Sequence, residues 1–231
     1  MPIALPFSFD AVSLEALIRL AEVRDGKVVF PGGSSYNLVI LPKLDRITVK
    51  ALNKLENLVE MGARIIGNPP HKSPSLVNFP DNDRQVLKTV MRLWGGKRPP
   101  KHHRTRHFGK GTIFWGENLY RKQLANNNFY PNYETTKSIL QSLGVSEDFR
   151  SSTHPIRFSH RRLANTDIYF VSNPTNKKVE TLGLFRVKNK VPELWHPEKG
   201  IIRSLPLYSS QNDKIKVPLK FNPFESYFIV F

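Results

Sequence analysis

The chain has 231 residues, of which 39% are hydrophobic and 11% aromatic, a composition that is typical of globular proteins and excludes a disordered chain. It contains no cysteine, which excludes disulfide bonds, a thiolate nucleophile and a cysteine-ligated metal. The net charge of +16 makes nucleic acid or another polyanion a candidate partner, although a generally basic surface is the simpler interpretation.

The sequence contains no predicted membrane segment. No apolar run approaches the roughly 18 residues that cross a bilayer. The first residues, MPIALPFSFDAV, lack the basic region and the long apolar stretch of a signal peptide. We therefore expect no membrane partner. The location stays open: the cytoplasm is the default, and the absence of cysteine fits a secreted protein as well.

Strand and helix patterns alternate over residues 1–145. In this half, Thr48 is the predicted N-cap of a helix in which leucines recur at helical spacing, and Gly62 follows as its end. Alternation of this kind predicts a parallel, doubly wound sheet with right-handed crossovers. The expected elements, in chain order, are strands at 27–30 and 36–41, a helix at 48–61, a strand at 63–67, a helix from Asp81 or Asp83, a strand at 111–115 and helical structure from about 118 to 144.

No cofactor site accompanies this sheet. Ligands of such sheets bind beyond the carboxyl ends of the strands, which here carry Pro42, the Asn68-Pro69-Pro70 run and Gly116. None of them is a glycine-rich phosphate loop. The run PGGSS at residues 31–35 precedes a strand instead of a helix, so it is predicted to be a turn. We expect no cofactor.

The periodicity changes after a polar stretch at residues 146–153, where we place a domain boundary. Beyond it, Tyr169 and Val171 alternate with Ile168, Phe170 and Ser172. Several short strands separated by turn signals predict an antiparallel β-sandwich over residues 146–231.

Three segments together resemble the C-terminal portion of the α-L-rhamnosidase-type glycoside hydrolases of family 106 and their relatives. They are DGKVVFPGGSSYNLVILP with the later GARIIGNPPHKSPSL, then GKGTIFWG, and finally HRRLANTDIYFVSN with FRVKNKVPELWHPEKGIIRSLPLY and the closing SYFIVF. The resemblance covers nearly the whole chain. The basic run KRPPKHHRTRHFGK at residues 97–110 departs from the family pattern, and it is predicted to be a loop.

The resemblance implies an accessory α/β domain with a glutamine-amidotransferase-like sheet, followed by a β-sandwich. It also implies that the sugar-cleaving barrel of the family lies N-terminal to the matched parts. This chain is then expected to be a truncated, split or fragmentary form that is inactive alone, and a separately encoded catalytic barrel is a possible partner.

The carboxylates give no independent sign of catalysis. Glycoside hydrolysis needs two carboxyl groups about 5–9.5 Å apart across one bond. Glu117 follows a predicted strand, while Asp167 and Glu193 lie at strand boundaries, where turn and surface roles are more common. We therefore assign no catalytic residue and treat enzymatic activity of this chain as undecided.

The basic run offers two alternatives. His103 and His107 are four residues apart, but the neighbouring prolines and cations disfavour a metal site, and we expect no metal. Arg98, Arg104 and Arg106 could bind phosphates, although no nucleic-acid-binding motif accompanies them. A polyanion-binding protein is therefore the alternative function, and nucleic acid is a possible partner that is not favoured.

Residues of the sandwich provide the candidate carbohydrate contacts. His160 and Arg161 precede a strand, where they either face a sugar pocket or domain seam, or the arginine is structural, with its guanidinium bound to backbone carbonyls or to Asp167. The structural arginine is the favoured interpretation. Trp195 either stacks on a pyranose or fills the sandwich core, and the core is the favoured interpretation. A tight hairpin is expected at Pro197 to Gly200.

Overall fold

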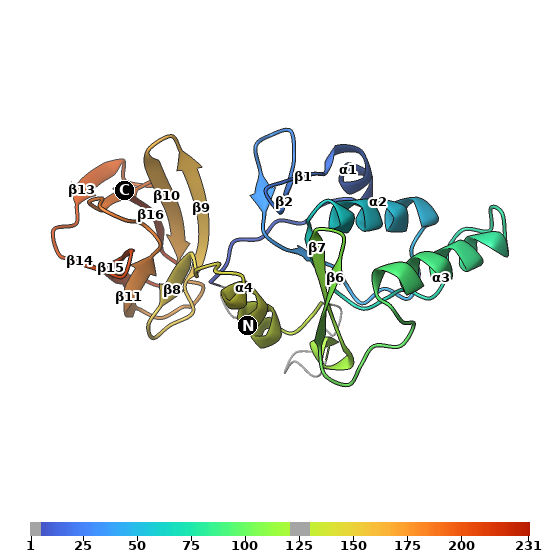
Figure 1. Ribbon diagram of the computed structural model, residues 1–231. Coiled ribbons are helices and arrows are strands. Elements are labelled where there is room, and N and C mark those ends of the chain that lie inside the picture. The colour runs from blue at the N-terminus through green and yellow to red at the C-terminus, as the bar shows by residue number, and fades with distance from the viewer. Residues whose placement is uncertain (1–5, 121–129) are drawn as a thin grey trace. The chain divides into compact units, whose positions relative to one another are not determined.

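The computed structural model describes residues 6–120 and 130–231 (Figure 1). These residues form two compact units, one from Ala11 to Val145 and the other from Ser146 to Phe231 together with residues 6–10. Residues 6–10 were expected in the first domain, which was predicted to span residues 1–145. They belong to the second unit because the Asp148 amide donates to the Pro6 carbonyl at 2.7 Å and the Ser8 hydroxyl donates to the Asp148 carboxylate at 2.7 Å.

The first unit opens with a short helix and a small antiparallel sheet. The helix is α1 (Leu14–Leu20), and the sheet consists of β1 (Glu22–Arg24), β2 (Lys27–Val29) and β3 (Ser35–Tyr36). The single strand expected at residues 36–41 is in fact two strands. Its start pairs back on β2, whereas β4 (Val39–Ile40) joins the main sheet.

The main sheet of this unit has the order β4-β5-β7-β6. Strand β5 (Arg64–Ile66) runs parallel to both β4 and β7 (Gly111–Trp115). The edge strand β6 (Arg104–Phe108) is antiparallel to β7. The prediction of a loop over residues 97–110 is therefore wrong for residues 104–108, which form β6. A turn at Gly109, with a φ of 55°, lets this strand pair with β7.

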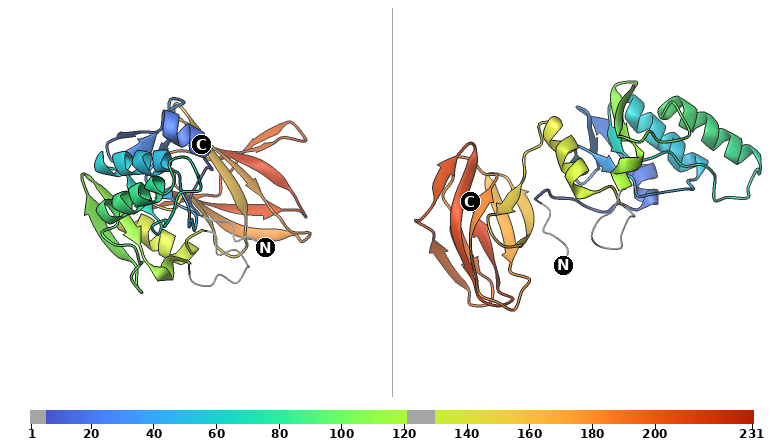
Figure 2. Two further views of the ribbon diagram at one scale, coloured as in Figure 1. Left: turned by 90° about the vertical axis from the view of Figure 1, so that its right-hand side faces the viewer. Right: turned by 90° about the horizontal axis from the view of Figure 1, so that it is seen from below.

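Helices cover both faces of the parallel strands. On one face Ile65 and Ile113 pack in a buried cluster with residues of α2 (Val49–Glu60) and α3 (Asp81–Leu93), which lie side by side in Figures 1 and 2. On the other face Ile66 and Phe114 pack with Ile139 of α4 (Tyr133–Ser142) and with the 3-10 helix η1 (Glu117–Tyr120). Burial on both faces explains why β5 and β7 are almost entirely apolar.

The predicted start of α2 is confirmed. The Thr48 hydroxyl accepts the Ala51 amide at 3.3 Å, as an N-cap side chain does. Gly62 follows directly with a φ of 123°, a conformation that side chains rarely adopt. None of the helices within residues 6–120 and 130–231 is long and apolar enough to cross a bilayer.

The second unit consists of two antiparallel sheets with one buried cluster. The sheet orders are β13-β12-β16-β10-β9 and β14-β15-β11-β8. The strands are β8 (Phe149–Ser151), β9 (Arg157–Leu163), β10 (Thr166–Ser172), β11 (Val179–Phe185), β12 (Glu193–His196), β13 (Ile201–Ser204), β14 (Ser209–Gln211), β15 (Lys214–Phe221) and β16 (Ser226–Val230).

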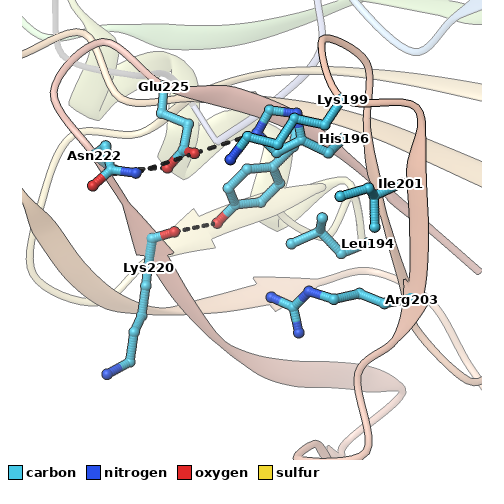
Figure 3. A pocket seen from close by; sticks show the side chains of 9 residues that line it. Leu194, His196, Lys199, Ile201, Arg203, Lys220, Asn222 and Glu225 are labelled. Carbon is cyan, nitrogen blue, oxygen red and sulfur yellow. Dashed lines mark hydrogen bonds and ion pairs between the residues drawn. The ribbon is translucent and has the colours of Figure 1, made fainter.

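In β10, β11 and β15 every second residue is buried, and the buried hydrophobic side chains of these strands form part of the core of this unit. In β10, Tyr169 and Val171 are buried while their neighbours are half-buried, which confirms the predicted alternation. Tyr169 packs edge-on against Phe185 of the other sheet, with 4.9 Å between ring centroids. A pocket opens between the β12–β13 hairpin and the ends of β15 and β16 (Figure 3). The chain is thus a mixed α/β protein in which antiparallel pairing predominates.

Candidate functional site

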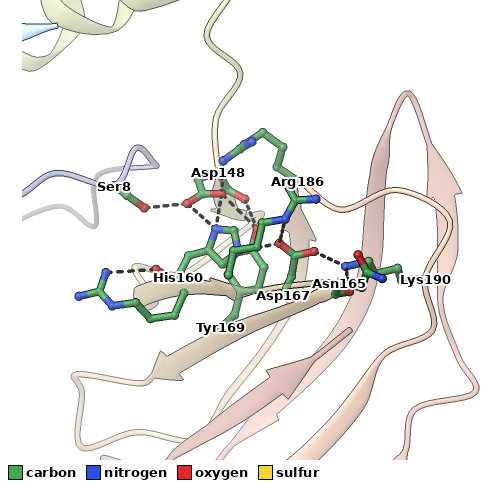
Figure 4. A network of polar contacts seen from close by, with 10 residues as sticks. Ser8, Asp148, His160, Asn165, Asp167, Tyr169, Arg186 and Lys190 are labelled. Atoms are coloured by element: carbon green, nitrogen blue, oxygen red, sulfur yellow. Dashed lines mark hydrogen bonds and ion pairs between the residues drawn. The ribbon is translucent and has the colours of Figure 1, made fainter. Parts of the chain in front are cut away.

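A buried polar network lies at one end of the sandwich (Figure 4). His160 of β9 lies between two carboxylates, with its Nδ1 atom 3.0 Å from Asp148 and its Nε2 atom 3.0 Å from Asp167. Each ring nitrogen thus lies within hydrogen-bond distance of a different carboxylate. The ring also stacks on its cross-strand neighbour Tyr169, with 4.0 Å between ring centroids.

Each carboxylate has further partners. Asp148 accepts from the Arg186 guanidinium at 2.8 Å, from the Tyr169 hydroxyl at 3.1 Å and from the Ser8 hydroxyl. Asp167 accepts from the Lys190 ammonium. The network therefore links β9 and β10, the loop after β11 and the N-terminal segment through two carboxylates.

The environment keeps both carboxylates ionised. Burial alone would raise the pKa of Asp148, but hydrogen bonds from His160 and Ser8 and the charges of His160 and Arg186 outweigh it and lower this pKa to about 2. Burial opposes ionisation of Asp167 too, and hydrogen bonds and charge from Lys190 and His160 lower its pKa. Burial and the neighbouring Asp148 charge raise the pKa of Tyr169, so its hydroxyl stays a donor.

This arrangement does not suit glycoside hydrolysis. A hydrolytic pair needs a general acid whose pKa is raised, together with room for a sugar between the two groups. Here both pKa values are lowered, and the imidazole of His160 occupies the space between Asp148 and Asp167. The network instead ties together segments that are distant in sequence.

The candidate carbohydrate contacts do not form one cluster. His160 joins Asp167 in the network, whereas the Arg161 side chain is exposed and donates to the His160 carbonyl at 3.4 Å. Trp195 lies on β12, which β16 and β10 separate from β9. His160 and Trp195 therefore do not line a common sugar pocket.

The core interpretation of Trp195 is wrong. Its side chain is 39% exposed, and its indole N–H donates to Glu193 at 2.9 Å. The inward positions of β12 belong to Leu194 and His196, since residues of a strand alternate between its faces. The expected hairpin is confirmed, because residues 197–200 connect β12 to β13 with His196 opposite Ile201.

The arginines of the basic run differ in their exposure and in their contacts. Arg98 and Arg104 are exposed. Arg106 is half-buried and donates to the Leu93 and Arg92 carbonyls, both at 3.0 Å. It thereby binds the carbonyls that the end of α3 leaves without helical partners. Of the three candidate phosphate contacts, Arg106 thus has a structural partner.

The remaining candidates show no metal or acid–base arrangement. His103 and His107 contact Asn118 and Thr112, at 3.4 Å and 3.3 Å. Glu117 begins η1 and is exposed. Across the described ranges, no group of three or more histidine or acidic side chains is placed to hold a metal ion.

Sequence reasoning missed Asp148, Arg186 and Lys190. Asp148 lies in the polar stretch that was interpreted as a boundary, yet it is buried. A signal for part of the network was available, because His160 lies seven residues before Asp167, on the strand that pairs with that of Asp167. Arg186 and Lys190 lie in the loop after β11, and a single sequence gives no indication that they pair with Asp148 and Asp167.

Comparison with known proteins decides the family. Residues 2–210 match the model of the alpha-L-rhamnosidase family, glycoside hydrolase family 106. The chain belongs to this family. A solved rhamnosidase structure from Novosphingobium sp. PP1Y is 28% identical with a TM-score of 0.78, and the match covers all of this chain and 20% of that one.

This rhamnosidase-family chain is also similar to a second protein in sequence and to a third in fold alone. A protein of Formosa agariphila named "Putative beta-glucuronidase" is 32% identical over 98% of this chain and 17% of its own length. A catalytic mutant of a GH42 β-galactosidase from G. stearothermophilus shares the fold, with a TM-score of 0.51 at 9% identity over 84% of this chain and 32% of its own. The chain thus spans a fifth or less of the two relatives that are similar in sequence.

Proposed function

We propose that this rhamnosidase-family chain is the C-terminal accessory part of a glycoside hydrolase, and that it cleaves no glycosidic bond when alone. The observation that carries the proposal is the state of Asp148 and Asp167. These two buried carboxylates are ionised and separated by an imidazole, which leaves them no general acid. The small share of the relatives' length that the chain covers also supports it.

The architecture suits a supporting role. We assign the α/β part, to about residue 145, as an accessory domain with a doubly wound, glutamine-amidotransferase-like sheet, and the remainder as a β-sandwich domain. Three parallel strands covered by helices on both faces support this assignment, although β6 adds an antiparallel edge. In this proposal a catalytic barrel acts on an α-L-rhamnosyl bond, either in a longer protein or as a separately encoded partner.

Activity assays with and without a catalytic part test the proposal. The purified chain is incubated with an aryl α-L-rhamnoside, alone and then together with the part of the Novosphingobium rhamnosidase that lies outside the matched region. We expect no sugar release from the chain alone. We expect the two pieces to copurify and to hydrolyse the rhamnoside faster than the larger piece does by itself.

Two results would overturn this function. Release of rhamnose by the chain alone would do so, and its loss in Asp167→Asn at an unchanged midpoint of unfolding would make that carboxylate catalytic. Full activity and stability of the larger piece without any accessory part would also do so. Asp213→Asn, which changes an exposed carboxylate of the same unit, is the matched control.

A further inference from the structure

The pocket of the sandwich has a volume of about 310 Å³, at the small end of the range for ligand sites (Figure 3). It lies away from the His160 network, on the other edge of the five-stranded sheet. Its walls come from β12, β13, β15, β16 and two turns. The lining residues are Leu194, His196, Lys199, Ile201, Arg203, Lys220, Asn222, Glu225 and Tyr227.

The pocket has more cationic than anionic groups. Three lining side chains are lysine or arginine, and Glu225 is the one carboxylate among them. Lys220 pairs with the exposed Glu180 at 2.9 Å. Within the described part of the chain, the side chains of Lys199 and Arg203 have no hydrogen bond or ion pair. Their charges are therefore available to an anion.

Glu225 does not neutralise these cations. One of its oxygens accepts the Asn222 amide at 2.7 Å, and the other lies 3.4 Å from the His196 Nε2 atom. Burial would raise the pKa of Glu225, but the hydrogen bonds from Asn222 and His196 outweigh it and lower this pKa. The carboxylate thus closes the turn between β15 and β16 and fixes the imidazole.

The other walls suit a sugar ring. Leu194 and the half-exposed Ile201 supply an apolar surface of the kind that packs against the C–H face of a pyranose. Among the described residues, the Nδ1 atom of His196 is buried without a hydrogen-bond partner. Buried polar atoms normally have a hydrogen-bond partner. A small movement of the imidazole ring would let a hydroxyl group of a bound sugar supply the partner that this nitrogen lacks.

We propose that this pocket binds a single anionic sugar residue, whose carboxylate or sulfate is held by Arg203 and Lys199 and whose ring packs on Leu194 and Ile201. The ligand class rests on the proposed carbohydrate function, whereas the requirement for an anion rests on the charges of the pocket. The bidentate geometry of an arginine suits a planar carboxylate or a sulfate. The accessory part would thereby hold acidic polysaccharide near a catalytic partner.

Ligand titrations of the purified chain test the proposal. Amide chemical shifts are followed with D-glucuronate, a sulfated monosaccharide, D-glucose and inorganic sulfate. We expect saturable shifts at β12 and β13 with the glucuronate, the sulfated sugar or both, and the stronger of the two identifies the anion. Arg203→Gln should weaken this binding about tenfold, the usual cost of losing a charged hydrogen bond.

Arg157→Gln is the matched control, because Arg157 is an exposed arginine of β9 and lies outside the pocket. It should leave the affinity unchanged. Four outcomes would each overturn the pocket assignment. They are binding of D-glucose as tight as that of the anionic sugars, binding of inorganic sulfate as tight as that of the anionic sugars, an unchanged affinity in Arg203→Gln, and no binding of any anionic sugar. A chain that fails these titrations but still supports rhamnoside hydrolysis would leave the proposed function intact.

Discussion

Replacing Asp148 by asparagine should destabilise the sandwich unit more than any exposed carboxylate change. The side chain of Asp148 is 5% exposed and contacts His160 and Arg186. Asparagine keeps the shape and one acceptor oxygen but removes the charge. The Arg186 guanidinium then loses the carboxylate that compensated for its charge, and His160 loses a charged hydrogen-bond partner.

The pKa of Asp148 sets the lower limit of the effect. A decrease from the ordinary 3.8 to about 2 corresponds to about 2 kcal/mol of stability at neutral pH. Breaking a buried ion pair sets an upper limit of about 3–5 kcal/mol. Because the pKa is lowered on folding, this stabilisation is complete above the ordinary value and is lost as the pH falls towards about 2.

Hydrogen exchange at neutral pH measures the change in each unit separately. Amides of β10 and β11 should exchange about 30-fold faster or more in Asp148→Asn, as expected for a loss of at least about 2 kcal/mol. Amides of α2 and β5, in the other unit, serve as the internal reference. Thermal unfolding followed by circular dichroism should show the difference between variant and wild type shrinking from pH 4 to pH 2.

The control is Asp213→Asn, which removes an exposed ion pair with Lys188. It should cost about 1 kcal/mol or less. Two results would refute this account of the network. One is a loss of stability in Asp148→Asn no larger than that in the control. The other is a difference in thermal stability between Asp148→Asn and wild type that persists at pH 2.

Three other predictions concern the α/β unit. Gly111→Ala should lower its midpoint of thermal unfolding strongly, because the added Cβ would lie 2.1 Å from the Val59 carbonyl oxygen; an unchanged midpoint would contradict this packing. Asn132→Ala should cost about 1–2 kcal/mol in denaturant unfolding, since this side chain caps α4 and accepts the amide of its third residue at 2.9 Å. Arg106→Gln should lower stability, whereas Arg104→Gln should not but should reduce heparin binding at low salt; the reverse pattern would refute their assigned roles.

Periodicity predicted the elements whose partners are close in sequence. The helix after Thr48 and the alternation around Tyr169 depend on local spacing, and both occur as expected. The basic run was harder, because neither its charges nor Pro99-Pro100 indicate a strand. Residues 104–108 become β6 through pairing with the apolar β7, which offers a free edge.

The site residues divide in the same way. His160 and Asp167 lie on paired strands, so their proximity could be inferred from a hairpin. Asp148, a buried carboxylate in a polar stretch, depends on partners up to 140 residues away along the chain, and spacing does not reveal them. Trp195 was assigned to the core because a tryptophan in a strand of a sandwich usually packs there, but the alternation of β12 places Leu194 there instead.

The contact of Pro6 and Ser8 with Asp148 has a consequence for modularity. Because residues 6–10 belong with Ser146–Phe231, the α/β unit is an insertion between this short N-terminal segment and β8, the first strand of the sandwich. Excising the sandwich as residues 146–231 would remove a hydrogen-bond donor and an acceptor from Asp148. A sandwich that retains residues 6–10 would keep both contacts, so the N-terminal segment has to accompany this unit whenever it is transferred.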